Sequence, residues 1–531
     1  MEGLQALRIT LYSSLLCLGY FAIIIFSYIV IAFPIQYALN VWRDARAFRA
    51  LPWVDIRNEV FPTLRACFRN AWGGGLKTVT EAYYKVNTVS LMKNGQTFLL
   101  FAFLPAQHSK NGEFFVTPTW WSRGAVTVPP SHFDWFLKEL DEKSTLPQIA
   151  LHLSHQQWSL PGQPRGEYFH YELVPYLKKL NPDQTWRQIA KSFELGLDIG
   201  SEWKTVNIVE DVVLGPATRM LARAYYGEAM MREDEFNKNI VPYVLAANVI
   251  PYNCSEFIPP LIYSAIYRFT GARQHKFQKK LDKSKGGSDE ETDVLTVYLK
   301  QAVKSTNPTD LDPSVISARF GMLVAGFTFE TITGMLSDIT SKLAARPEDL
   351  KVIERELQTV DAVRTGDWAM KDLVDLVHLD SYFKESMRYM AFNGFGLALV
   401  RKVTAPQGVR LPGDVAIILP KGTWAGIPVD AIHRDKDYFE DPDEFKPWRF
   451  VNPSETDASA LVRNQMTAVS DSFLAFGRGK GVCPGRFFAS MAMKLFVVYM
   501  VSRYDIRPPP GSKPDPQGQF WKMQLRRKVG A

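Results

Sequence analysis

The sequence predicts a mainly α protein with a minor β part, and two observations support this class. Helical periodicity dominates after His132, and the run from Val315 to about Ala345 is long and apolar enough for a central buried helix. Short β-rich pieces bounded by turn residues occupy only two regions, 97–128 and 401–419. With an ordinary charged fraction of 22% in 531 residues, the chain is expected to fold around a large core.

The N-terminal segment is the most apolar part of the chain. Residues 11–33 carry no charge, and 23 residues of helix span roughly 34 Å, enough to cross a bilayer core of about 30 Å. Arg43, Arg46 and Arg49 follow with only Asp44 opposing them, which places the following chain in the cytosol. A cleaved signal peptide is the alternative, but its apolar region is usually shorter. We expect a tail (1–10), a transmembrane helix (11–33), a linker (34–60) and one large domain (61–531).

Charge and motif content exclude several classes of protein. The 62 basic and 55 acidic residues leave a diluted charge of +7, which predicts no nucleic-acid partner. The four cysteines (Cys17, Cys67, Cys254 and Cys483) form no CxxC pair, which argues against a disulfide scaffold and a zinc finger. The chain has no HExxH, GxSxG or P-loop motif, and its glycine spacing does not predict a dinucleotide site.

The elements can be predicted in chain order from their start and stop signals. Asp312 and Pro313 form a helix N-cap and first turn, and Pro347 ends the long apolar helix. A charged, glycine-containing stretch without apolar period predicts an exposed loop over residues 279–292. The remaining expected elements are strands over 97–104, 113–119, 125–128 and 401–419, and helices over 372–390 and 485–503.

The stretch FLAFGRGKGVCPGRFFA, residues 473–489, carries the strongest chemical signal. Its glycines allow a close backbone approach, and Cys483 lies just before a predicted helix. Backbone amides and the positive end of the helix dipole there are expected to lower the thiol pKa, and Arg478 and Lys480 add positive charge. Such a thiolate suits a nucleophile, a redox thiol or a metal ligand.

The spacing of this stretch, Phe476-x-x-Gly479-x-x-x-Cys483-x-Gly485, resembles the haem-binding loop of the cytochrome P-450 family, the haem-thiolate monooxygenases. The resemblance implies the fold of that family and makes Cys483 the axial iron ligand of haem b, pushing electron density toward the iron. The cofactor-binding residues that it implies in the loop are Phe476, Gly477, Arg478, Gly479, Lys480 and Gly485.

One position departs from the family pattern. The family usually has Arg or His two residues before the cysteine, in contact with a haem propionate, whereas this chain has Gly481. Lys480 or another cation is expected to substitute for it. His170, Trp186 and Arg187 are further candidates for a propionate contact.

Two more motifs support the resemblance. Glu385 and Arg388 share one helix face as an ExxR pair, and Pro447-x-Arg449-Phe450 looks like the later segment of the family that completes it. In the family these three charged residues hold the core on the haem side, so Glu385, Arg388 and Arg449 join the predicted cofactor-binding set.

The long helix should cross the distal haem face, where the family carries (Ala/Gly)-Gly-x-(Asp/Glu)-Thr. Aligned on Ala325 and Gly326, the acid position is Thr328 and the alcohol position is Phe329. Aligned on Glu330 and Thr331, the acid and alcohol fit but the small pair is lost. A hydroxyl that holds a water is needed for proton delivery. Both registers stay open, with Thr328, Glu330 and Thr331 as catalytic candidates.

The resemblance implies a lipophilic substrate whose pocket is lined by Ala325, Gly326, Phe329, Gly396 and Leu397. It implies insertion of one oxygen atom from dioxygen, with electrons from NADPH through a membrane-bound reductase that docks on the basic cysteine-loop side. The dense motif and the anchor look like microsomal members at the endoplasmic reticulum, particularly fungal ones that oxidise terpenoid, indole or polyketide secondary metabolites. The alternatives are a reductase-independent isomerase or peroxygenase, motivated by Phe329, and a non-catalytic haem-binding membrane protein.

Overall fold

The molecule is described from a computed structural model of the full chain. The structure describes residues 35, 51–54, 62–70, 75–84, 92–93, 96–97, 112–119, 124–140, 182–193, 197, 199–234, 238–241, 293–306, 308–313, 315–316, 319–320, 328–390, 397–413, 417–451, 464–514 and 520–529. The predicted transmembrane helix over 11–33 and the predicted loop over 279–292 lie outside these residues.

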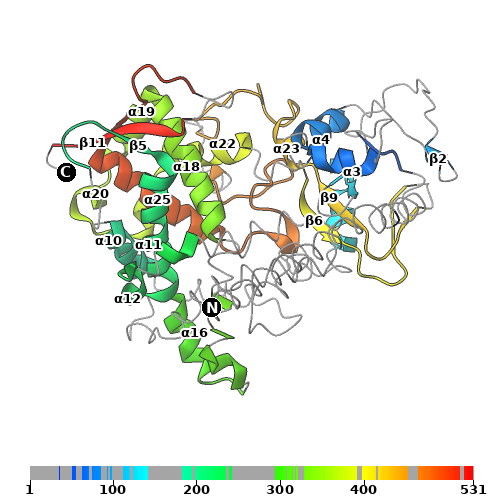
Figure 1. Cartoon of the computed structure of the whole chain (residues 1–531), viewed down its shortest axis with the longest axis horizontal. Helices are drawn as coiled ribbons and strands as arrows, with labels where there is room; N and C mark the ends of the chain where they lie inside the picture. The colour runs from blue at the N-terminus through cyan, green and yellow to red at the C-terminus, as the bar shows by residue number, and fades with distance from the viewer. Residues whose placement is uncertain are drawn as a thin grey trace, which may run out of the picture.

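Helices make up most of the described chain (Figure 1). The α-helices are α3 (Pro62–Arg69), α4 (Gly75–Tyr84), α5 (Phe133–Trp135), α10 (Pro182–Ser192), α11 (Leu214–Tyr226), α12 (Glu228–Met231), α16 (Val294–Ala302), α18 (Glu330–Ala345), α19 (Pro347–Gln358), α20 (Ala362–Thr365), α21 (Met370–Val374), α22 (Val377–Tyr389), α23 (Val429–His433) and α25 (Arg486–Arg503). Shorter helical turns are Pro130–His132, Phe136–Leu140, Ile208–Val213, Pro308–Leu311 and Gly479–Gly481.

Within the described part of the chain, the strands form four small sheets. The largest has the order β3-β4-β9-β6, in which only the β4–β9 pair is parallel. A three-stranded antiparallel sheet has the order β10-β11-β5, and two hairpins pair β1 with β2 and β7 with β8. The strands are β1 (Met92–Lys93), β2 (Gln96–Thr97), β3 (Phe115–Thr117), β4 (Ala125–Thr127), β5 (Lys204–Asn207), β6 (Ala398–Lys402), β7 (Val409–Arg410), β8 (Ile418–Leu419), β9 (Trp424–Ile427), β10 (Tyr504–Arg507) and β11 (Lys522–Arg527).

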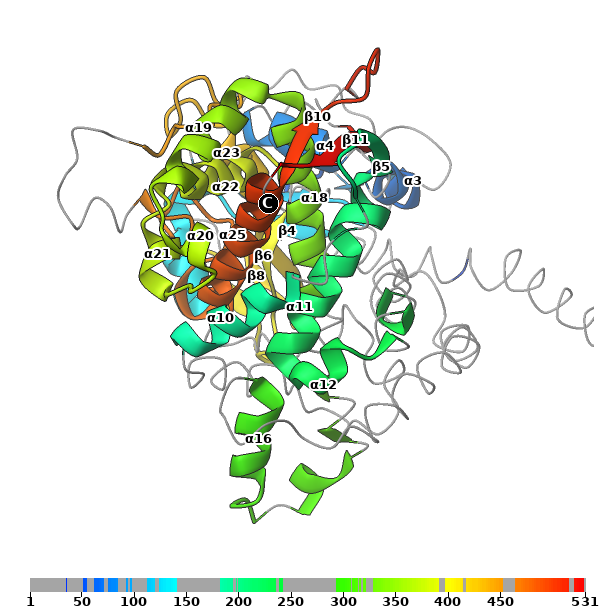
Figure 2. The same cartoon turned by 90° about the vertical axis from the view of Figure 1, so that its left-hand side faces the viewer.

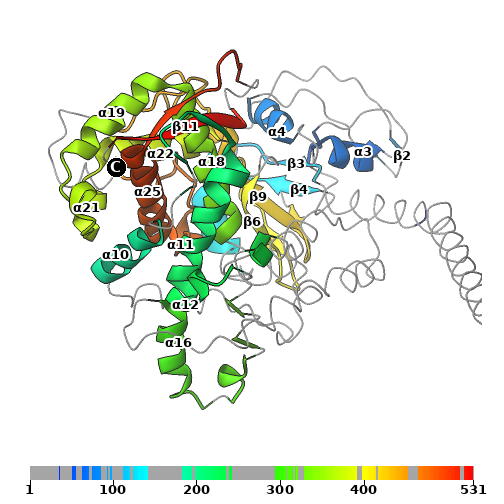
Figure 3. The ribbon, with the colours of Figure 1, turned by 60° about the vertical axis from the view of Figure 1, so that its left-hand side comes forward.

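Five of the helices and the largest sheet lie at opposite ends of the molecule. Helices α10, α11, α18, α19 and α25 gather at one end, and β6 and β9 lie at the other end with α3 and α4 (Figures 1 and 3). The sheet β10-β11-β5 lies beside the C-terminal end of α25, which continues directly into β10 (Figure 2). The predicted class, mainly α with a minor β part, is confirmed.

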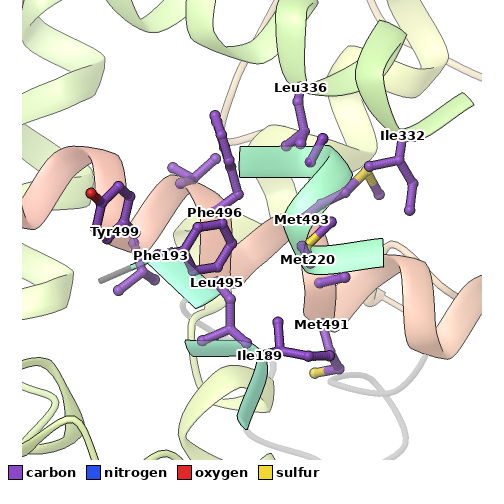
Figure 4. Packing of buried hydrophobic residues seen from close by; sticks show 14 of the residues in the cluster. Ile189, Phe193, Met220, Ile332, Leu336, Met491, Met493, Leu495, Phe496 and Tyr499 are labelled. Atoms are coloured by element: carbon purple, nitrogen blue, oxygen red, sulfur yellow. The ribbon is translucent and has the colours of Figure 1, made fainter. Parts of the chain in front are cut away.

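Helix α25 lies in the centre of the main core. Its side chains Met493, Leu495 and Phe496 are buried against residues of α10, α11 and α18 (Figure 4). Burial of one such side chain contributes about 1.5–3 kcal/mol. The stretch Gly479–Arg503 is apolar and long enough to span a membrane, yet over half of its most apolar window is buried, so packing in the core accounts for its composition.

Two predicted boundaries need correction. Leu51, Trp53 and Val54, in the range assigned to a linker, are buried, and Trp53 forms a bridge with Val116 of β3, so the folded part begins before residue 61. The helix predicted over 372–390 is two helices, α21 and α22. The break is stabilised from α19, because the Glu356 carboxylate accepts the backbone N–H groups of His378 and Leu379 at 2.7 and 2.9 Å.

Candidate active site

The cysteine loop is a tight turn closed by its own backbone. The N–H of Cys483 donates to the carbonyl of Phe476 at 2.8 Å, and the N–H of Gly477 donates to that of Leu474 at 2.8 Å. Gly477 has a φ of 78°, and a Cβ there would meet the Leu399 side chain at 2.9 Å. Only glycine suits such a position. The turn delivers Cys483, half-buried, to the start of α25.

Two opposing effects act on the Cys483 thiol. Burial raises its pKa, and this effect outweighs the backbone N–H groups of Gly485 and Arg486 and the charge of Arg486, which lower it. The lowered pKa expected from the sequence is therefore wrong for the thiol by itself, because desolvation exceeds the effect of the amides. A bound metal ion would reverse the balance, since a coordinating thiol is deprotonated.

The ExxR pair is fully buried and bidentate. Arg388 donates from Nε to Glu385 Oε2 and from Nη2 to Glu385 Oε1, both at 2.8 Å. Arg449 Nε donates to Glu385 Oε2 at 3.0 Å, and the backbone N–H of Lys446 donates to Oε1 at 2.9 Å. One buried carboxylate therefore joins α22 to the segment that contains Pro447 and Arg449, and the structure brings together the three charged residues that the sequence singled out.

His433 connects this charged group to the cysteine loop. Its carbonyl accepts Arg388 Nη1 at 2.6 Å, and its ring Nε2 accepts the N–H of Leu474 at 3.0 Å. The ring also stacks on Phe473, with centroids 5.5 Å apart. Burial, together with the nearby Arg388 charge, lowers the pKa of His433 to about 3, so the ring stays neutral and keeps its acceptor nitrogen at physiological pH. The motifs identified in the sequence do not include this histidine.

Arg401 of β6 is a buried cation near the cysteine loop that sequence reasoning did not single out. Its side chain is 1% exposed, and Nη1 donates to the carbonyls of Leu399 and Val400 at 3.2 and 3.0 Å. A Cβ at Gly481 would lie 2.4 Å from Arg401 Nη2. The guanidinium therefore occupies the space that a side chain at position 481 would need. No sequence signal separates Arg401 from the neighbouring Lys402, because the contact spans 80 residues.

The other residues proposed to contact a propionate have different surroundings. Lys480 is exposed, and Arg478 pairs with Asp471 at 2.7 Å. Arg187 pairs with Asp367 at 2.5 Å, and Trp186 is buried with its ring 5.6 Å from that of Phe488. His170 lies outside the described residues.

At the distal helix, the described residues begin at Thr328. Thr328 Oγ1 lies 3.3 Å from the hydroxyl of Tyr225 on α11, and Thr331 Oγ1 donates to the Thr328 carbonyl at 3.2 Å. Glu330 and Thr331 are exposed, yet surrounding protein partly desolvates the carboxyl and raises the pKa of Glu330. By contrast, Phe329 is 3% exposed and packs in the main core.

Two of the predicted pocket residues belong to cores. Phe329 was expected to line the substrate pocket but faces the helical core, and Leu397 is 3% exposed in a small cluster with Val79, Ala125 and Trp424. Their apolar side chains are used in packing, a use that the sequence pattern does not distinguish from pocket lining. Ala325, Gly326 and Gly396 lie outside the described residues.

With this geometry described, comparison with known proteins identifies the family. A sequence model described as "Cytochrome P450" matches residues 233–530, more than half of the chain. The chain belongs to the cytochrome P450 family. The P450 match includes α18, the buried Glu385–Arg388 pair and the cysteine loop.

Individual relatives are similar over most of their length. The chain is 26% identical over 484 residues to cytochrome P450 monooxygenase lnaC of Aspergillus flavus, covering 84% of each protein. It is 25% identical to cytochrome P450 monooxygenase ecdH of Aspergillus rugulosus, covering 86% of this chain and 88% of that protein. A further fungal relative is cytochrome P450 monooxygenase efuH of Hormonema carpetanum, 25% identical over 516 residues. The chain is accordingly an oxidoreductase of the P450 monooxygenase type.

Solved structures agree in fold. The haem domain of cytochrome P450DA matches with a TM-score of 0.55 at 15% identity, covering 79% of this chain and 90% of that one. A zebrafish cytochrome P450 solved with abiraterone matches with a TM-score of 0.54 at 19% identity, covering 76% and 93%. At these identities the structures support the P450 fold.

The residues present fit the haem that a P450 holds through a cysteine thiolate. Cys483 is half-buried at a helix start, and a Cβ at Gly485 would meet no protein atom within 4 Å, which shows open space on the same loop. A buried guanidinium, Arg401, lies against the same loop, and its charge suits a carboxylate such as a haem propionate.

Proposed function

We propose that this P450 inserts one oxygen atom from dioxygen into a lipophilic small molecule, by hydroxylation, epoxidation or multistep oxidation, with electrons that a reductase takes from NADPH. The observation that carries the proposal is Cys483 at the start of α25, in a glycine turn closed by the Phe476 carbonyl. When bound, a thiolate-ligated haem supplies activation of dioxygen and cleavage of its O–O bond.

The proximal residues hold the cofactor in this proposal. Cys483 is the iron ligand, and Arg401 anchors a propionate in place of the side chain that Gly481 lacks. Glu385, Arg388 and Arg449 fix the backbone beneath the loop. The bidentate pair at 2.8 Å and the bond from Arg449 at 3.0 Å support this role, because buried charge-assisted bonds resist rearrangement.

On the distal side, the proposal adopts the alignment on Glu330 and Thr331, and these two residues transfer protons. Thr331 is accessible, and its hydroxyl, which donates to the Thr328 carbonyl, is of a type that can also accept a hydrogen bond from a water. Glu330 supplies the carboxyl that exchanges protons with that water, and its raised pKa favours a protonated population. Thr328 is turned toward Tyr225 and takes a supporting role.

Burial of Phe329 weakens the case for the isomerase or peroxygenase alternative. A reductase-independent isomerase or peroxygenase was favoured by a phenylalanine at the alcohol position. In the register of Glu330 and Thr331, Phe329 is a core residue and the alcohol is present. The monooxygenase therefore has the better support.

The proposed partner is a membrane-bound NADPH-cytochrome reductase on the cysteine-loop face. Lys480 and Phe487 are exposed there, and Arg478 and Arg486 are half-buried. Basic residues around an exposed aromatic ring suit an acidic flavoprotein surface. No nucleic-acid partner is proposed.

We further propose a single-pass protein of the endoplasmic reticulum membrane, anchored in the lipid by residues 11–33 with the catalytic domain in the cytosol. The proposed substrates are terpenoid, indole or polyketide secondary metabolites. The uncharged segment and the following arginines support the anchor.

The decisive experiment is co-expression of the full chain with a reductase in microsomes. The wild type should give the red-shifted carbon-monoxide band of thiolate haem and NADPH-dependent products from a library of these metabolites. Cys483→Ala should lose both, while Cys67→Ala, which removes a buried cysteine in α3, should keep both. A wild type without the band, or a Cys483→Ala protein that retains it, contradicts the ligand assignment.

A further inference from the structure

Arg486, the first residue of α25, contacts the backbone of the proposed ligand residue. Its Nη1 donates to the carbonyl of Cys483 at 3.0 Å, and its Nε donates to the carbonyl of Thr467 at 3.2 Å. The guanidinium carbon lies 4.2 Å from the ring centroid of Phe487, which covers its flat face. Two directed bonds and a stacked ring therefore hold this charge in one orientation beside Cys483.

Arg478 and Lys480, the other cations in the loop sequence, have different surroundings from Arg486. Arg478 is neutralised by its ion pair with Asp471, and Lys480 is exposed, where solvent screens its charge. Arg486 is half-buried, and its Nη1 lies 3.0 Å from the carbonyl oxygen of Cys483. A cation fixed near a sulfur ligand withdraws electron density from it.

We propose that Arg486 is a positioning residue that sets how strongly the Cys483 sulfur donates electrons, and thereby the reduction potential of the bound haem. The proposal rests on the proposed function. The reduced centre carries one more negative charge than the oxidised centre, so a neighbouring guanidinium stabilises the reduced form. Arg486 raises the reduction potential and makes electron delivery to the protein easier.

The test is an equilibrium dye-coupled redox titration of the full-length holoprotein, which needs neither reductase nor substrate. Arg486→Gln should keep the carbon-monoxide band. At a fixed applied potential it should lower the ratio of reduced to oxidised protein about tenfold, which is 59 mV for one electron. Arg486→Lys keeps the charge and should lie close to the wild type. Arg503→Gln removes a cation at the far end of α25 and should leave the potential unchanged.

A histidine variant tests the charge within one protein and replaces Arg486→Gln if that variant does not fold. In Arg486→His the potential should fall as pH rises through the imidazole pKa of about 6.5, more steeply than in the wild type. Equal potentials in wild type and Arg486→Gln, or a histidine variant that follows the wild-type pH profile, overturn the proposal. A wild type without the thiolate band would instead overturn the proposed function, so the two failures are distinguishable.

Discussion

The proximal and distal sides of the site are held by different kinds of bond. On the proximal side, the fully buried Glu385 accepts four hydrogen bonds at 2.8 to 3.0 Å, three of them from guanidinium groups. At the start of α18, the hydroxyl contacts of Thr328 and Thr331 are 3.2 to 3.3 Å long. Charge-assisted bonds are shorter and roughly twice as strong as neutral ones. The charged group on the proximal side is therefore held more tightly than the distal hydroxyls.

The largest expected effect comes from breaking the proximal side at Glu385. Glu385→Gln removes the charge shared by Arg388 and Arg449, both in contact with its Oε2. Uncompensated buried guanidinium groups should lower the free energy of unfolding by about 3–5 kcal/mol and reduce haem content. Chemical denaturation and pyridine-haem quantitation measure these changes. Glu354→Gln, which breaks the partly exposed pair with Lys528, should cost under about 1 kcal/mol. Similar losses of unfolding free energy in Glu385→Gln and Glu354→Gln would contradict the view that the proximal side is held by the stronger bonds.

The second test concerns the space shared by Gly481 and Arg401. A Cβ at position 481 would lie 2.4 Å from Arg401 Nη2, so Gly481→Ala should displace the guanidinium and cost about 1–3 kcal/mol. Haem should dissociate faster from both Gly481→Ala and Arg401→Gln. The exchange variant Gly481→Arg with Arg401→Gly should recover part of the retention, because it returns a cation to the same space. If the exchange variant loses haem as fast as Arg401→Gln, Arg401 does not take the place of a side chain at position 481.

The distal side should respond in catalysis rather than in stability. Thr331→Ala should lower product formed per NADPH consumed on the order of tenfold, because the water loses its hydroxyl partner. Thr328→Ala should lower it about twofold, since its contact is with Tyr225. Thr333→Ala is a matched control, because that hydroxyl bonds to the Phe329 carbonyl within the helix. A larger loss in Thr328→Ala than in Thr331→Ala would favour the other register.

The smallest effect is a pH-dependent change at Asp430 of α23. Burial raises the pKa of Asp430 to about 6, against the opposing charge of Arg434. The folded pKa exceeds the unfolded value of about 3.9, so this carboxyl stabilises the fold when protonated and loses that contribution as pH rises through 6. Asp430→Asn should be about 1–2 kcal/mol more stable than wild type at pH 7.5 and equal to it near pH 4. Thermal unfolding measured from pH 4 to pH 7.5 tests whether Asp430→Asn gains stability relative to wild type as pH rises. Asp134→Asn, at an exposed carboxylate, is the control.

Prediction from sequence worked best where neighbouring residues carry the signal. The helix predicted over 485–503 is α25, starting one residue later, and the ExxR spacing put Glu385 and Arg388 on one helix face. It was wrong where distant segments decide. The helix over 372–390 is interrupted because Glu356, about 20 residues earlier, caps the amides of α22. Phe329 looked like a pocket residue, but packing turned it into the core.

By itself, the sequence determined the class of fold, the family and the cysteine that carries the proposed chemistry, because spacing along the chain records local backbone requirements. Tertiary structure alone decided which cation fills the space beside Gly481 in the cysteine loop. Lys480 is the nearer residue in sequence and is exposed, whereas Arg401 reaches Gly481 from a strand 80 residues away. The physical reason is that a buried charge is located by the space and dipoles that several segments create together, and sequence separation does not measure that space.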